Sequence, residues 1–178
     1  VLATIVAKET PNLRSVFVRH NQKHSKELEE SANEIAKKIK ISHKSLDSSL
    51  ESNASETKMR EARYEILYKE LKENEILLMG HTLSDKVETF FINLLRGTRV
   101  RGLKSIPKMT GKVKRPLLGI SKNDLIDYAK ENNIQYLDDE TNFDNKIIRN
   151  WIRNELIPKV DEKFKGSIEE KISNLIIE

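Results

Sequence analysis

The stretch that most constrains the fold of this chain is residues 75–97, EILLMGHTLSDKVETFFINLLRG. Residues 76–79 form a short, continuous apolar run, which is typical of a parallel strand covered on both faces. Gly80 then allows a sharp turn, and polar side chains precede an apolar helix face. Because open α/β sheets bind ligands at the carboxyl ends of strands, beside helix N-termini, this stretch predicts a ligand site.

Asp85, Glu88 and Thr89 follow the turn at positions i, i+3 and i+4, so one helix face is expected to carry both carboxylates and the hydroxyl. A structural alternative explains the same residues. Thr82 or Ser84 followed by acids in the first turn is ordinary capping chemistry, and acids there complement the helix dipole. From this stretch alone, the two interpretations are equally supported.

The composition excludes several classes of protein. With 178 residues, of which 37% are hydrophobic and 34% charged, the chain is large enough for one soluble domain with a real core. It contains no cysteine, which excludes a disulfide scaffold, a thiolate zinc site and a persulfide-carrying cysteine. No apolar run approaches membrane-spanning length and no signal peptide is visible, so we expect a cytoplasmic protein without a membrane partner.

The basic residues are unevenly placed, although the net charge is only +4. No acid falls between Glu88 and Asp124, whereas this segment contains Arg96, Arg99, Arg101, Lys104, Lys108, Lys112, Lys114 and Arg115. A segment that carries only positive charges beside a polar site predicts a polyanionic partner. Nucleic acid is favoured over an anionic membrane as that partner. The alternative is a solvated, lysine-rich loop.

Hydrophobic periodicity predicts alternating strands and helices. Besides the central strand and helix, we expect strands at 13–18 and 113–118, an edge strand within 44–50, a basic loop at 98–111, and helices at 1–8, 25–40, 56–71, 122–132, 145–158 and from about 161 to the end. Ser25 and Ser121 are the expected N-caps. The first helix has no capping residue, which suggests that residues upstream of Val1 are absent from the chain.

This alternation predicts the fold class. Strands that alternate with helices are typical of an α/β fold with a Rossmann-like, mainly parallel sheet flanked by helices, here with a helical C-terminal extension. A sheet built in this way has a single ligand crevice. The polar clusters along the chain are therefore expected to share it.

Five motifs occur in a set order along the chain. They are N-A-S-E at 53–56 with Arg60, Arg63 and Tyr64; G-H-T-L-S-D-K-V-E-T at 80–89; L-R-G at 95–97 with R-G-L at 101–103; R-P-L-L at 115–118; and D-E-T-N at 139–142 with Asp144, Arg149, Asn150 and Arg153. In this order and spacing, over about residues 1–160, they resemble the catalytic domain of the tRNA(Ile)-lysidine synthases, within the PP-loop ATP pyrophosphatases.

The resemblance implies a domain organisation and a reaction. Residues 1–118 would be a PP-loop nucleotide-binding domain with the adenine nucleotide alpha hydrolase-like fold, 119–160 its helical end, and 161–178 the start of a linker helix. In that family, ATP adenylates the C2 oxygen of the wobble cytidine of an isoleucine tRNA. The ε-amine of free lysine then displaces AMP, which forms lysidine. The implied partners are isoleucine tRNA, free lysine and ATP with Mg²⁺, and a homodimer is allowed.

This reaction would give the paired carboxylates a role. A lysine amine has a reference pKa of about 10.4, so it must be held and deprotonated before it attacks. Asp85 and Glu88 are the expected catalytic acids, of which one recognises the ammonium and the other takes the proton. Arg115, held beside a proline, suits an anionic group such as the adenylate phosphate.

The resemblance also implies binding residues. Arg149 and Arg153 fall on one helical face and are expected to grip phosphates of the nucleotide or the tRNA, while Asn142 and Asp144 order the helix start. His20 is expected near the nucleotide, with a structural histidine as an equal alternative. The other expected substrate-binding residues are His81, Thr89 and Asn150, and the expected tRNA contacts are Arg60, Arg63, Arg99 and Arg101. Arg60 and Arg63 would serve equally well as surface ion-pair partners. No metal ligand is predicted.

The chain departs from the family pattern at three places. Ser84 stands where the family has the first of two adjacent aspartates, so Asp85 alone would have to supply the function of that pair. Arg19 precedes His20 where the family has a smaller polar or acidic residue. The loop S-G-G-x-D-S, which cradles pyrophosphate with backbone N–H groups, does not occur in these 178 residues. We therefore expect a fragment of such a synthase, truncated at both ends, that has little or no activity by itself.

Two alternatives remain open from the sequence. One is a sulfur-transferring PP-loop tRNA enzyme of the 2-thiocytidine type, against which the absence of cysteine counts. The other is a non-catalytic tRNA-binding module that kept the fold and lost the nucleotide loop. The basic segment between Glu88 and Asp124 allows this second alternative, and upstream sequence would discriminate it.

Overall fold

The computed structural model describes residues 1–20, 25–51, 54–137 and 140–176. Its elements are α1 (Leu2–Glu9), β1 (Arg14–Arg19), α2 (Ser25–Lys38), β2 (Ser42–Asp47), α3 (Glu56–Glu70), β3 (Leu77–Leu78), α4 (Leu83–Leu95), α5 (Val100–Leu103), β4 (Met109–Thr110), β5 (Val113–Lys114), α6 (Lys122–Glu131), η1 (Glu140–Phe143), α7 (Ile148–Trp151), η2 (Ile152–Leu156), α8 (Ile157–Phe164) and α9 (Ile168–Leu175). They form two compact units, which we call unit 1 (1–77 with 131–137) and unit 2 (78–130 with 138–178).

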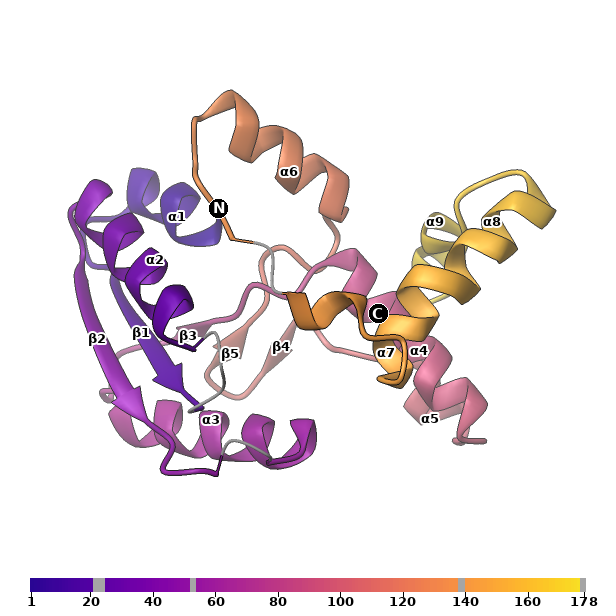
Figure 1. The fold of residues 1–178 in the computed structure, drawn as a ribbon, viewed down its shortest axis with the longest axis horizontal. Coiled ribbons are helices and arrows are strands. Elements are labelled where there is room, and N and C mark those ends of the chain that lie inside the picture. The colour runs from indigo at the N-terminus through magenta and orange to yellow at the C-terminus, as the bar shows by residue number, and fades with distance from the viewer. Residues whose placement is uncertain (21–24, 52–53, 138–139, 177–178) are drawn as a thin grey trace. The chain divides into compact units, whose positions relative to one another are not determined.

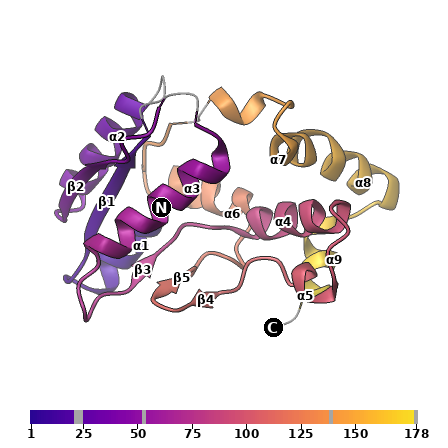
Figure 2. The same cartoon turned by 90° about the horizontal axis from the view of Figure 1, so that it is seen from below.

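Unit 1 is built on a parallel pair of strands. β1 and β2 run side by side, with a register from Arg14↔Ser42 to Arg19↔Asp47. Parallel strands need a crossover connection, which α2 supplies by packing against both strands. Figures 1 and 2 show α3 on the side of the pair opposite to α2. The prediction of a parallel strand–helix–strand arrangement flanked by helices is confirmed.

The helices of unit 1 agree closely with the predicted ranges. α1 begins after Val1 without a side-chain cap, as its sequence predicts. α3 is capped by Ser55, whose hydroxyl accepts a hydrogen bond from the Lys58 backbone N–H at 3.4 Å. α2 begins at Ser25 itself, and the position before it lies outside the described residues. The predicted cap at Ser25 therefore stays a prediction.

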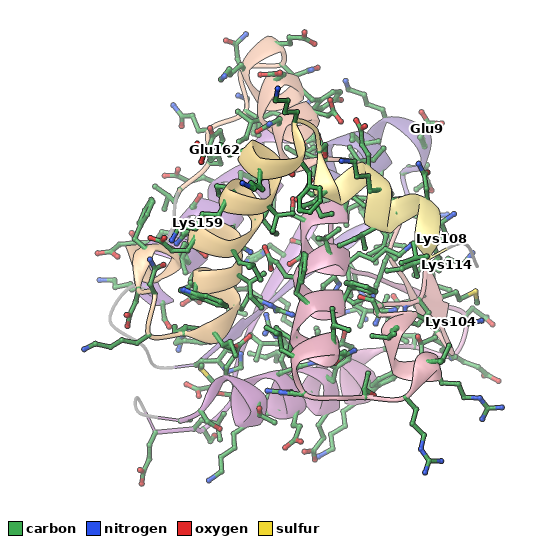
Figure 3. All side chains as sticks on the ribbon, turned by 90° about the vertical axis from the view of Figure 1, so that its right-hand side faces the viewer. Glu9, Lys104, Lys108, Lys114, Lys159 and Glu162 are labelled. Atoms are coloured by element: carbon green, nitrogen blue, oxygen red, sulfur yellow. The ribbon has the colours of Figure 1, made fainter. Side chains whose placement is uncertain are left out.

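Unit 2 has an apolar core gathered around α4. Leu83, Val87 and Phe90 form one stripe along this helix, at the spacing of an amphipathic helix. Val87 is completely buried and packs in one cluster with Ile152, which is also completely buried, and with residues of α8 and α9. Figure 3 shows α4 between α8 and α9. The fold thus places the first turn of α4 beside the chain that follows residue 140.

The second sheet differs from its prediction. It has the order β3-β5-β4, and β4 and β5 pair in the antiparallel sense as a hairpin. The predicted strand 76–79 is only two residues long and is not covered on both faces, because Ile76 is 50% exposed. The predicted strand 113–118 ends at Lys114, since the chain turns at Pro116, which lacks the N–H that a ladder requires.

The predicted basic loop 98–111 contains a short helix, α5, and the strand β4. Gly97 explains the motif L-R-G, because it ends α4 with a left-handed φ of 68° that other residues adopt at a cost. Gly102 explains R-G-L, since a Cβ at this position would collide with the Thr98 side chain. Gly80, by contrast, does not adopt a left-handed conformation.

The C-terminal helices also differ from their predicted ranges. The predicted helix 145–158 begins at Ile148 and continues through a π-helical turn, η2, into α8. Pro158 does not end it: this proline lies in the first turn of α8, directly after the π-helical turn η2. The predicted last helix begins only at Ile168, after the left-handed Lys165 ends α8.

Two further expectations concern the chain as a whole. The compact units divide the chain at 77/78, 130/131 and 137/138, whereas the domain boundaries expected at 118/119 and 160/161 stay a prediction. Within the described ranges, no helix combines the length and the apolar character needed to cross a membrane.

We predict that an ion-pair cluster makes the stability of the chain pH-dependent. Arg14 Nε and Nη2 contact Glu75 Oε1 and Oε2 at 2.8 and 2.6 Å, and these hydrogen bonds lower the pKa of Glu75 to about 2. A carboxyl whose pKa is lower in the folded state stabilises the fold above its unfolded pKa, and this contribution is lost as pH falls. Glu75→Gln should therefore destabilise the chain at neutral pH, and the difference should shrink between about pH 4.5 and pH 2.

Urea unfolding followed by circular dichroism across this pH range measures the effect. Glu61→Gln, at an exposed position of α3, is the matched control and should leave the pH profile unchanged. A difference between wild type and Glu75→Gln that stays constant down to pH 2 would contradict the assigned role of Arg14.

Candidate active site

The first turn of α4 carries a complete capping box. The Thr82 backbone N–H and its hydroxyl donate to Asp85 Oδ2 at 2.8 and 3.0 Å, and the Asp85 N–H donates to Thr82 Oγ1 at 3.4 Å. The structural interpretation of this stretch is therefore correct for Asp85. Asp85 is half-buried, and its Oδ1 makes no hydrogen bond within the part of the chain that the structure describes. One carboxylate oxygen therefore caps the helix, and the other makes no hydrogen bond to a described residue.

Glu88 lies one turn further along α4 and is completely buried. Arg153 binds it with two hydrogen bonds, from Nε to Oε1 at 2.6 Å and from Nη2 to Oε2 at 3.0 Å. Arg149 Nε lies 3.5 Å from Oε2. Both carboxylate oxygens therefore face guanidinium groups. The predicted contact of Glu88 with a substrate amine stays a prediction.

In this cluster, burial and ion pairing have opposite effects on the pKa values of Glu88 and Arg153. Burial raises the pKa of Glu88, and the hydrogen bonds from Arg153 oppose that rise. Burial acts to lower the pKa of Arg153, but the hydrogen bonds to Glu88 and the negative charges of Glu88, Asp85 and Glu169 together raise it. The two guanidinium groups within ion-pair distance favour the ionised form of Glu88.

The arginines connect two motifs that are far apart in sequence. Arg149 Nη2 donates to Thr89 Oγ1 at 3.1 Å, and Thr89 in turn donates to the Asp85 carbonyl at 2.8 Å. Arg153 Nη1 donates to Asn142 Oδ1 at 3.2 Å. The structure thus brings together Asp85, Glu88 and Thr89 from one motif with Arg149, Arg153 and Asn142 from another.

The turn before α7 supports this arrangement. Asn150 is buried and donates to the Asp144 carbonyl at 3.1 Å, while Asp144 Oδ1 accepts from the Lys146 N–H at 3.0 Å. Asp144 orders the helix start, as expected, and Asn150 helps it from inside the fold. Asn142 was expected to have only an ordering role, but it contacts Arg153 directly. Asn154 was not among the predicted site residues. Its Nδ2 donates to the backbone carbonyl of Asn142 at 3.1 Å and so holds Asn142 in place.

Arg115 lies at the β4–β5 hairpin, and its expected contact with the adenylate phosphate stays a prediction. Its side chain is buried, and Nη1 donates to the Pro107 carbonyl at 2.9 Å and to Thr110 Oγ1 at 3.3 Å. These contacts hold the base of the β4–β5 hairpin. His81 lies half-buried immediately before α4, and Arg99 and Arg101 are exposed at α5. Figure 3 shows Lys104, Lys108 and Lys114 along the same edge of unit 2.

The remaining predicted residues belong to unit 1. His20 follows the end of β1, and Arg63 is a half-buried residue of α3. Arg60 lies over the Tyr64 ring, with 5.3 Å from its guanidinium carbon to the ring centre. Asn53 and Asp139, the first residues of two motifs, lie outside the described residues.

Unit 1 also contains a cavity of about 340 Å³ between α1, α2 and residues 132–137. Thr4, Glu34 and Ile134 are among its lining residues, and none of the predicted site residues lines it. The described residues contain no cluster of three or more metal-ligating side chains. The motif residues therefore lie apart from this cavity.

The comparison with protein families decides what this site belongs to. The model of the PP-loop domain matches residues 1–160. The chain belongs to the PP-loop domain family. This PP-loop domain is similar to several proteins named tRNA(Ile)-lysidine synthase, and it spans about a third of their length.

Three of these relatives show the extent of the similarity. The protein of Coxiella burnetii is 37% identical over 154 residues, which are 82% of this chain and 34% of the relative. The protein of Buchnera aphidicola is 38% identical over 85% of this chain and 36% of the relative. The chloroplastic protein of Gracilaria tenuistipitata is 38% identical over 68% of this chain and 40% of the relative.

A solved structure confirms the fold of this PP-loop domain. The U34-tRNA thiolase NcsA of Methanococcus maripaludis, solved with its 4Fe-4S cluster, matches with a TM-score of 0.70 at 17% sequence identity. The match covers 96% of this chain and 66% of the thiolase chain. At this identity the likeness concerns the fold alone.

We predict that Glu88→Gln strongly destabilises unit 2. The substitution keeps the shape of the side chain but leaves Arg149 and Arg153 without their counter-charge, and removing one partner of a buried ion pair costs about 3–5 kcal/mol. The fluorescence of Trp151, the only tryptophan of the chain, reports on α7 during urea unfolding.

Glu155→Gln is the matched control, because it removes the exposed ion pair with Lys159, whose atoms are 2.7 Å apart. Such a pair contributes about 1 kcal/mol or less. Equal losses of stability in the two variants would contradict a buried, fully paired Glu88.

Proposed function

We propose that this PP-loop domain is the catalytic part of an ATP-dependent ligase that joins lysine to C2 of the wobble cytidine of isoleucine tRNA. The observation that carries the proposal is its similarity, over more than four fifths of its length, to relatives named tRNA(Ile)-lysidine synthase. The cluster around Glu88 supports it, because it places an acid and two arginines beside each other on helices from the two most characteristic motifs.

Asp85 is the proposed residue for the lysine amine. Its Oδ2 is used by the capping box, whereas Oδ1 is left without a hydrogen bond among the described residues. A half-buried carboxylate can bind an ammonium group and accept a proton from it before attack. The amine nitrogen then bonds to C2 of the cytidine, the bond from C2 to the adenylated oxygen breaks, and AMP leaves with the electron pair.

Glu88 is proposed as a positioning residue and not as the base. Because its two oxygens are engaged by Arg153 and Arg149, it fixes both guanidinium groups in one orientation. Arg149 is also linked to Thr89, so the arginines are anchored to α4 at two points. Guanidinium groups that are oriented in advance stabilise the negative charge on a phosphate that leaves or transfers. The proposed anion is the phosphate of the adenylated intermediate.

ATP, Mg²⁺ and tRNA complete the proposal. Mg²⁺ commonly binds largely through substrate phosphates, and here it would be held by the phosphates of ATP. The ion would neutralise charge on the phosphates of ATP. The exposed residues Arg99 and Arg101, with the lysines along the same edge of unit 2, are the proposed contacts for the tRNA backbone.

A direct assay tests the proposed ligase. The complete gene product that contains this chain is incubated with ATP, radiolabelled lysine and isoleucine tRNA bearing a wobble cytidine. Label in the tRNA together with released AMP is the expected result. Tight tRNA binding without any transfer of label would instead favour the non-catalytic binding module, and sulfur incorporation would favour the 2-thiocytidine type.

We predict that Asp85→Asn lowers the rate of lysine transfer by about 100-fold or more and leaves tRNA binding intact. An asparagine side chain can still accept the capping hydrogen bonds from Thr82, but it cannot hold the ammonium or take its proton. The rate is measured in the same assay, and tRNA affinity by filter binding.

Asp124→Asn is a closely matched control. Asp124 occupies the equivalent position of α6, where its Oδ2 accepts from the Ser121 hydroxyl at 2.7 Å and its N–H donates to Ser121 Oγ at 3.1 Å. It should transfer lysine at the wild-type rate. Unchanged turnover in Asp85→Asn would remove Asp85 from the proposed mechanism.

A further inference from the structure

The cavity of unit 1 has the size of a small-molecule site, and the proposed function does not use it. Its volume is about 340 Å³, which falls within the usual range for ligand pockets. One wall is a side of α2, with lining residues from Glu27 to Ile39, and another wall is the segment 132–137. Because an α-helix rises about 1.5 Å per residue, the α2 wall extends over roughly 18 Å. The cavity is therefore elongated, which favours a linear ligand.

Part of the cavity lining is apolar. Ile35, Ile39 and Ile134 contribute half-buried side chains. Tyr136 and Leu137 also line the cavity, although they are 47% and 53% exposed. Apolar surface of this kind is stabilised when a ligand removes it from water. A ligand that fits this wall needs a hydrocarbon body.

The charged part of the lining is mainly negative. Glu27, Glu30 and Glu34 of α2 line the cavity with exposed side chains. Within the described lining, Lys38 is the one positively charged residue, and its Nζ donates to the Asn133 carbonyl at 2.9 Å. Opposite charges on a ligand and its site favour their association. The lining therefore favours a cation.

The spacing of the three acids favours one class of cation. They occupy positions i, i+3 and i+7 of α2, so they follow one side of the helix. Their separations along the helix axis are roughly 4.5 and 6 Å. An extended triamine with a three-carbon and a four-carbon linker repeats nearly the same intervals between its ammonium groups. Its methylene groups match the apolar part of the lining.

A buried hydroxyl gives a separate indication of a ligand. Thr4 lines the cavity, and its Oγ1 is shielded from solvent without a hydrogen bond to any described residue. Buried polar atoms are almost always paired, so this exception calls for an explanation. A ligand in the cavity that carries N–H donors would supply the partner that this oxygen lacks.

We propose that this cavity binds a linear polyamine. Its ammonium groups donate charge-assisted hydrogen bonds to Glu27, Glu30 and Glu34, and one of them also reaches Thr4 Oγ1. Its hydrocarbon chain covers the apolar lining. The site contains none of the residues proposed for lysine transfer, so it does not rest on that function.

Calorimetric titration of the 178-residue chain with spermidine at low ionic strength tests the site. We expect one spermidine per chain. Putrescine, which has one ammonium group fewer, should bind at least about 10-fold more weakly, because hydrogen bonds to charged groups are among the stronger ones. For the same reason, the double variant Glu30→Gln/Glu34→Gln should bind spermidine at least about 10-fold more weakly than wild type. Both positions are exposed, and circular dichroism checks that this variant is folded.

Glu9→Gln/Glu61→Gln is the matched control. It removes the same charge from exposed positions of unit 1 that do not line the cavity. This variant should bind spermidine as wild type does. An equal loss of affinity in the two double variants would overturn the proposal, because the net charge of the chain would then hold the polyamine.

Thr4→Val separates a shaped site from a general attraction of cations. It keeps the shape of the side chain and removes the unpaired hydroxyl. The variant should therefore unfold at the same temperature as wild type or higher, and it should bind spermidine more weakly. Equal affinities for spermidine and putrescine would overturn the proposal. Complete displacement of spermidine by Mg²⁺ at the same charge concentration would also overturn it, because both results describe a non-specific layer of counter-ions.

Discussion

The interaction on which unit 2 depends is the buried contact of Glu88 with Arg149 and Arg153. A carboxylate that is completely removed from water is stable only when opposite charges and hydrogen bonds surround it. The contact therefore requires α7 and η2 to lie along α4 in a single register, with the apolar stripe of Leu83, Val87 and Phe90 packed beside it. Charge pairing and core packing thus specify the same arrangement of helices.

The same helix turn separates two acids that look equivalent in sequence. Asp85 lies at the helix start, where one oxygen closes the capping box and the other stays available. Glu88, one turn later, faces the core and is saturated by guanidinium groups. The capping and the functional interpretations of this turn are therefore compatible, because each uses a different oxygen or a different acid. Burial gives the two carboxylates different surroundings.

Unit 1 has the opposite electrostatic character. Its parallel strands end beside a histidine and an arginine that lack internal partners, whereas the charges at the other end, around Arg14, are fully paired with Glu70 and Glu75. Paired charges hold the strands and α3 together.

The sequence by itself determined the order of strands and helices, the amphipathic face of α4, the cap of α6 and the membership of the key residues in recognisable motifs. These features depend on neighbours within a few positions, which periodicity and capping rules describe. Only the tertiary structure decided that Glu88 is buried against Arg153, that Asn142 supports that arginine, that Arg115 braces a hairpin, and that β3 is short and partly exposed. Each of these facts depends on partners that are remote along the chain or on packing around a whole element, and single-sequence patterns carry no information about such contacts.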